Sequence, residues 1–169
     1  MEGSLVLHTW ARYEANDPNR GTSQDWVVWT AGEWSKLLPG KDAAVGTSTR
    51  VPREIADKLC ARCYPPGPYW SVRDSKVINS RFTATLVGTS TKEIHIKLEG
   101  ALELIHPAEG KETDRHVKAR LLGYLRYNLA SKTVTSFVLT SDEAESVWSW
   151  QGRPQVSKML FAVEKEASE

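Results

Sequence analysis

The sequence predicts a mainly β protein of the α+β class, an antiparallel meander that curves into a partial or closed barrel. Apolar and polar residues alternate through most of the stretch from Val72 to Glu164, which is the period of strands with one buried face. Short links separate the alternating segments, so neighbouring strands are expected to pair antiparallel. Gly100 and Gly123 interrupt two long segments near their centres, and glycine inside a strand marks a bulge or bend. Together these features favour a strongly coiled sheet.

The N-terminal part is predicted to supply two further strands. Apolar and polar residues alternate from Leu5 to Tyr13, and the odd-numbered residues are expected to share one face. Residues 26–29 form a short apolar strand, and the turn-forming residues 15–21 link the two strands. A lone strand is not stable, so Leu5–Tyr13 needs partner strands from the rest of the chain. This requirement favours a single domain over residues 1–169.

Two short helices are predicted, near residues 31–38 and 52–63. Thr30 and Glu33 are spaced as a capping box, in which each side chain bonds to the backbone N–H of the other residue. Pro52 suits the first position of the second helix, where a missing N–H has little cost. The apolar residues of the second helix are spaced to lie on one face: Ile55, Ala56, Leu59 and Cys63.

The strands expected in the second half share a pattern in which every second residue is apolar. They are expected near residues 82–87, 94–104, 117–127, 134–140 and 158–164. Residues 88–91 and 128–131 are expected to form hairpin turns, and 107–114 a polar loop.

Length and charge limit the classes of partner. A chain of 169 residues fits one domain whose core needs no disulfide scaffold. The formal net charge of +1 argues against nucleic acid and anionic membranes, because both require a basic excess. No apolar run approaches about 18 residues, so membrane insertion is not expected.

The N-terminus lacks the basic and apolar regions of a signal peptide. A domain cut from a longer exported protein would show the same feature, so the compartment stays open and other domains of a larger protein are candidate partners.

Tryptophan is the unusual component of the chain, with seven residues. Each supplies a large apolar surface and one N–H donor, so tryptophan serves as a core filler or as the lining of a ligand groove. The sequence leaves both interpretations open. The ligand interpretation predicts an aromatic-lined cleft beside residues 64–70, with the candidate binding residues Tyr64, Tyr69, Trp70 and Trp10.

Cys60 and Cys63 form a C-x-x-C motif at the end of the second predicted helix. Dithiol redox sites usually place this motif at a helix N-terminus, where the dipole stabilises a thiolate, so the placement here weakens a redox interpretation. A structural zinc needs four ligands, for which His8 and His95 are candidates. Soft thiolates also suit copper(I), which needs fewer ligands. A disulfide and a pair of buried core thiols are the other interpretations.

No sequence motif indicates a catalysed reaction. The chain contains no P-loop, G-x-G-x-x-G, G-x-S-x-G or zincin motif, and its carboxylates do not single out a catalytic pair. The sequence therefore does not decide whether the protein is an enzyme, and the missing motifs favour a protein without catalytic activity. The sequence favours a non-catalytic β-rich module that binds a small ligand or a partner through the aromatic-lined cleft. The alternative is a thiol-based metal or redox protein that uses Cys60 and Cys63 with copper or zinc.

Three segments resemble a bacterial domain of planctomycete-type genomes. They are Ala31–Pro39 (AGEWSKLLP), Tyr64–Pro66 (YPP) and Leu121–Leu125 (LLGYL). The similarity extends over most of the chain and implies one compact domain. That family is associated with larger or exported proteins and has no assigned activity, so the resemblance adds nothing about chemistry.

Overall fold

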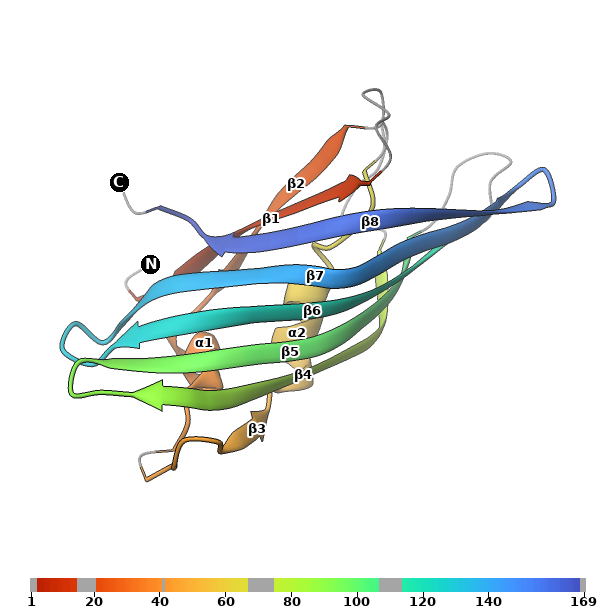
Figure 1. The fold of residues 1–169 in the computed structure, drawn as a ribbon. Coiled ribbons are helices and arrows are strands. Elements are labelled where there is room, and N and C mark those ends of the chain that lie inside the picture. Colours follow the sequence, from red (N-terminus) through yellow and green to blue (C-terminus); the bar gives the residue numbers. More distant parts are fainter. Residues whose placement is uncertain (1–2, 15–20, 41, 67–74, 107–113, 168–169) are drawn as a thin grey trace.

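The computed structural model describes residues 3–14, 21–40, 42–66, 75–106 and 114–167. In this part of the chain, eight strands form one antiparallel sheet in the order β2-β1-β8-β7-β6-β5-β4-β3 (Figure 1). The strands are β1 (Leu5–Tyr13), β2 (Thr22–Trp29), β3 (Ser48–Arg50), β4 (Lys76–Thr89), β5 (Glu93–His106), β6 (Arg115–Asn128), β7 (Thr133–Trp150) and β8 (Arg153–Lys165). The helices are α1 (Ala31–Trp34), which continues as the 3-10 turn η2 (Ser35–Leu37), and α2 (Arg53–Cys60). The mainly β class and the two short helices are confirmed.

The sheet consists of a meander and an added hairpin. Strands β4 to β8 are neighbours in chain order, and the β1–β2 hairpin joins the last of them. β1 pairs with β8 from Leu7–Lys165 to Tyr13–Met159, and with β2 along its other side. The odd-numbered residues of β1 are buried, as the alternation predicts. The expectation that this strand needs partners from the rest of the chain is therefore confirmed.

Gly100 and Gly123 do not mark β-bulges, because the strand register passes through both without a shift. They instead allow close contacts between strands of the coiled sheet. A Cβ atom on Gly123 would lie 2.1 Å from the carbonyl oxygen of Val138. A Cβ atom on Gly100 would lie 2.4 Å from the ring of Phe82 and 2.6 Å from the carbonyl oxygen of Arg81. Real Cβ atoms essentially never approach another heavy atom within 3.0 Å. No other residue type fits at these two positions without a shift of the neighbouring strand.

The sheet does not close into a barrel, which corrects the closed form of the expectation. β2 and β3 are the two edges and do not pair with each other. Helix α2 lies against the face of the sheet (Figure 1), in contact with β4 beside one edge and with the other edge strand, β2. After the helix, the carbonyl of Arg62 accepts from Thr9 Oγ1 at 3.4 Å, and its guanidinium pairs with Asp25 of β2 at 3.3 Å. The helix packs its own apolar face on the sheet, and the edge strands do not meet.

Both helices begin with local hydrogen bonding or proline geometry. Thr30 Oγ1 accepts from the N–H of Glu33 at 3.3 Å, and the Glu33 carboxylate accepts from the N–H of Thr30 at 2.7 Å. The predicted capping box is confirmed. Helix α2 starts at Arg53, one residue later than expected, because Pro52 is the extended N-cap residue. The residues of α2 that are buried against the sheet are Ile55, Ala56, Leu59 and Cys60.

The core occupies the space between α2 and the concave face of the sheet. Its largest fully buried side chains include Phe137, Phe161, Leu7, Ile55, Ile96, Leu102, Leu104 and Leu125. Burial of each such side chain contributes about 1.5–3 kcal/mol to stability. The space left among Trp29, Leu59 and Phe137 is about 10 Å³, at or below the size that holds one water molecule. Side chains therefore fill this part of the interior.

Several strands differ from the expectation. β2, β4 and β8 begin four, six and five residues before their expected starts at 26, 82 and 158. β7 continues to Trp150, far beyond the expected end at Thr140. The β7–β8 register shifts between Thr140 and Glu145, and a register shift interrupts the alternation by which a strand is recognised. β3 was not predicted from the sequence. All three residues of Ser48–Arg50 are exposed, so this strand has no apolar face to reveal it.

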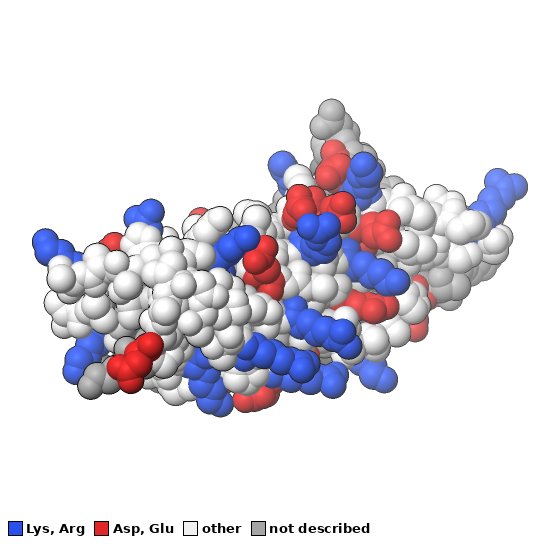
Figure 2. Space-filling view, turned by 60° about the horizontal axis from the view of Figure 1, so that its bottom comes forward, with Lys and Arg blue, Asp and Glu red and all other residues white. Residues whose placement is uncertain are grey.

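Charged side chains are mixed over the surface. In the view of Figure 2, lysines and arginines are interspersed with aspartates and glutamates, and a broad part of the face carries few charges. This mixture agrees with the net charge of +1. In the part of the chain that the structure describes, no helix has the length and apolar character needed to cross a membrane.

Candidate functional site

Helix α2 ends at Cys60, three residues before the expected end, so Cys63 lies just beyond the helix. Both cysteines are free, fully buried thiols. Cys63 Sγ donates to the carbonyl of Leu59 at 3.8 Å. Burial raises the pKa of the Cys60 thiol well above its ordinary value and raises the pKa of Cys63 to about 12. Both groups are therefore protonated at neutral pH, and a thiolate forms only when the site opens. These observations favour the core interpretation, and a thiol-based metal or redox role stays a prediction.

The two candidate histidines lie apart from the cysteines. His8 projects from the outer face of the sheet, the face opposite α2, where its ring stacks on Trp26 at 4.4 Å and contacts Trp10 at 3.8 Å. His95 lies on β5, with Nε2 3.2 Å from a carboxylate oxygen of Glu93. Among the residues that the structure describes, no three metal-ligating side chains form a group. The structure does not bring His8 or His95 together with the C-x-x-C pair.

Tyr64 is buried on the inner side of the sheet. Its ring stacks on His106 with centroids 5.9 Å apart, and its carbonyl accepts from Ser23 Oγ at 2.9 Å. Ser75 Oγ lies 2.7 Å from Nδ1 of His106. His106 is 1% exposed, so its ring is closed to a ligand from solvent. Trp10 projects from the opposite face, so these two candidate binding residues do not line one cleft. Tyr69 and Trp70 lie outside the described residues, and the cleft expected beside residues 64–70 stays a prediction.

The burial of Arg115, the first residue of β6, was not predicted. Arg115 is 8% exposed, its guanidinium lies 4.3 Å from the ring of Trp148, and Nη1 donates to Tyr13 Oη at 2.6 Å. Its inward position follows from the sequence, because Arg115 continues the buried alternation of Val117 and Ala119. The sequence signal for this buried arginine was a charged residue at a position where the alternation predicts an inward side chain.

The outer face contains a hollow of about 310 Å³, which we call the tryptophan hollow. It lies over β1, β8 and β7, at the register shift between Thr140 and Glu145. There the N–H of Phe161 donates to Ser141 Oγ at 2.9 Å, so a side chain takes over a bond that the strand ladder would normally make. The lining residues are Trp10, Ala11, Arg12, Thr22, Thr140, Ser141, Leu160, Phe161 and Ala162. The bulge in β7 thus produces a mainly apolar depression beside a tryptophan.

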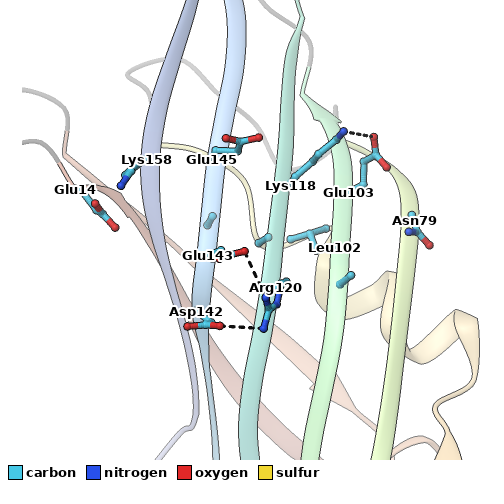
Figure 3. Close-up of a pocket in the computed structure, with 13 residues that line it drawn as sticks. Glu14, Asn79, Leu102, Glu103, Lys118, Arg120, Asp142, Glu143, Glu145 and Lys158 are labelled. Atoms are coloured by element: carbon cyan, nitrogen blue, oxygen red, sulfur yellow. Dashed lines mark ion pairs between the residues drawn. The ribbon is translucent and has the colours of Figure 1, made fainter.

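A second depression, the ionic hollow, is shown in Figure 3. Its β7 residues, 142–145, directly follow Thr140 and Ser141 of the tryptophan hollow. The ionic hollow measures about 590 Å³ and includes five carboxylates and three cations: Glu14, Glu103, Asp142, Glu143, Glu145, Lys118, Arg120 and Lys158. Residues of opposite charge alternate along one row of the sheet, because Glu103 pairs in register with Lys118, Lys118 with Glu145, and Glu145 with Lys158. Arg120 lies 3.2 Å from Asp142 and 3.6 Å from Glu143.

The charges of the ionic hollow largely satisfy one another. Lys118 lies 3.8 Å from Glu103, and the guanidinium of Arg120 is shared between two carboxylates (Figure 3). These side chains are mostly exposed, and such surface pairs contribute little stability each. The row therefore stabilises cross-strand register. Five of the eight charged side chains form ion pairs within the hollow: Glu103, Lys118, Arg120, Asp142 and Glu143. The tryptophan hollow is the stronger candidate for binding.

The chain matches no protein-family model, no curated protein and no solved structure. The class of protein is therefore defined by the fold alone: an open, coiled antiparallel sheet wrapped around one helix. The resemblance to a planctomycete-type bacterial domain stays a prediction.

Proposed function

We propose that this protein is a non-catalytic binding module that takes a small, mainly apolar ligand in the tryptophan hollow. The carrying observation is the contrast between the filled core, with about 10 Å³ of space, and the hollow of about 310 Å³ on the outer face. Ligand sites in proteins are usually concave, mainly apolar and about 300–1,000 Å³ in volume. Trp10 supplies the aromatic wall that the sequence suggested, now on the outer face.

The lining has the chemistry of a recognition site. Leu160 and Ala162 present aliphatic side chains beside Trp10, and these exclude water from one side of a bound apolar group. Thr22 and Thr140 add hydroxyl groups that can donate or accept a hydrogen bond. None of the lining side chains is a nucleophile paired with a base, which supports binding without catalysis.

Binding is expected to be weak for fragment-sized ligands. At about −0.3 kcal/mol per non-hydrogen atom, a ligand of about twelve such atoms binds with a Kd of about 2 mM. Chemical-shift titration of the 15N-labelled chain detects binding in this range. We expect fragments with an aromatic or aliphatic body to shift the amide signals of residues 10–12, 140–141 and 160–162.

Matched variants test the location. The rings of Trp10 and Trp26 both contact the ring of His8, but only Trp10 lines the hollow. Trp10→Ala should abolish binding, whereas Trp26→Ala should retain it. Ala162→Phe should block the hollow without removing any of its other side chains. The proposal is wrong if no fragment binds, or if folded Trp10→Ala and Ala162→Phe proteins bind as the unmodified chain does.

A further inference from the structure

Arg12 is an unpaired cation in the lining of the tryptophan hollow. It projects from the outer face of β1, exposed to solvent, and its neighbours in register are Thr22 and Leu160. Its guanidinium forms no ion pair or hydrogen bond with any residue in the described part of the chain. Arg120, in the adjacent ionic hollow, is by contrast held by two carboxylates. The five N–H donors of Arg12 are therefore available to a ligand.

We propose that the hollow binds a small monocarboxylate with an aromatic or aliphatic body. This inference rests on the proposed function and adds the class of ligand. The guanidinium fork of Arg12 matches the two oxygens of a carboxylate, and such charge-assisted pairs are directional. The carboxylate lies at Arg12, where the Thr22 hydroxyl can donate to it. The apolar body extends over Leu160 and Ala162 toward Trp10.

The surrounding charges favour one negative charge over several. The ionic hollow begins beside Arg12, where Glu14 is the next outward-facing residue of the chain and its N–H bonds to the carbonyl of Lys158. Asp142 and Glu143 of the ionic hollow lie on the β7 bulge, directly after Thr140 and Ser141 of the tryptophan hollow. With five carboxylates against three cations in that neighbourhood, a di- or polyanion is repelled, whereas a monoanion can pair with Arg12 alone.

The test compares two probes of nearly the same size and shape, the anion 4-phenylbutyrate and its neutral amide 4-phenylbutyramide, in which an NH2 group replaces one carboxylate oxygen. We expect the acid to bind about tenfold more tightly than the amide, the loss that accompanies removal of one charge-assisted hydrogen bond. Arg12→Gln should weaken 4-phenylbutyrate by about the same factor and leave the amide unchanged. Arg126→Gln removes another exposed arginine of the outer face, outside both hollows, and should change neither affinity.

The outcomes separate this inference from the proposed function. If acid and amide bind equally, or if Arg12→Gln binds the acid as well as the unmodified chain, the carboxylate inference is wrong while the binding module stands. If inorganic phosphate displaces 4-phenylbutyrate at equal concentration, the selectivity for a monocarboxylate is wrong. If neither probe nor any neutral apolar fragment binds, the proposed function fails as well. Circular dichroism of each variant establishes that it is folded.

Discussion

Replacement of Gly123 by alanine tests whether this glycine is required for the coiled sheet. Gly123 lies in the middle of β6, opposite Leu98 of β5 and Leu139 of β7. An added Cβ atom would lie 2.1 Å from the carbonyl oxygen of Val138 and 2.6 Å from Cα of Leu139. Both are backbone atoms, so a change of rotamer does not relieve the contact. β6 and β7 must move apart, which weakens their hydrogen bonds and the packing of the core.

The expected loss is at the upper end of the range for overpacked cores. Such substitutions cost about 1–3 kcal/mol, and a contact with backbone on both sides leaves little room to relax, so we expect about 3 kcal/mol. In a domain of this size, each 1 kcal/mol lowers Tm by about 2–4 °C, which gives a decrease of about 6–12 °C. Thermal unfolding followed by circular dichroism, together with urea titration, measures both quantities.

Gly88 provides a matched control within β4. A Cβ atom there meets nothing nearer than Cβ of His95 at 3.7 Å, an ordinary contact. Gly88→Ala should leave stability unchanged or raise it by up to about 1 kcal/mol, because alanine restricts the unfolded chain. Equal losses in Gly88→Ala and Gly123→Ala would refute the steric argument, as would a Gly123→Ala protein that melts with the unmodified chain.

Two further predictions concern a buried thiol and a helix cap. The pKa of Cys63 rises from an ordinary value of 9.0 to about 12 in the folded state, so its contribution to stability is complete below pH 9.0 and is lost as pH rises toward about 12. Urea titrations across that window should show a shallower decline for Cys63→Ala than for the unmodified chain, and parallel declines would contradict the assignment. Thr30→Ala should lower the free energy of unfolding by about 1 kcal/mol, while Thr30→Ser retains the cap. Equal stability of the two Thr30 variants in urea would show that the capping bond contributes nothing.

The candidate site was only partly predictable. The sequence suggested Trp10 as a ligand residue, and the alternation of β1 places Arg12 on the same face, so this pair was within reach of sequence reasoning. Thr140 and Leu160 were not, because they reach Trp10 only through the pairing of β1 with β8 and of β8 with β7. The hollow itself arises from the register shift in β7, which the pattern of residues 141–145 does not reveal.

The surroundings of Cys60 and Cys63 were also only partly predictable from the sequence. The helical spacing placed Cys63 on the apolar face with Leu59, which agrees with its burial. The spacing left open whether the sulfurs meet a histidine, each other or the core. Only the packing of α2 against the sheet shows both thiols to be free and buried.

The sequence by itself determined the mainly β class, the two short helices and the capping box at Thr30. These features depend on the repeat of apolar residues and on local hydrogen bonds, which neighbouring residues specify. The tertiary structure decided that the sheet stays open around α2 and that β7 bulges after Thr140. It also decided that Trp10 and Arg12 line a hollow on the outer face. These features depend on contacts between residues far apart in the chain, whose register is set by the packing of the whole sheet.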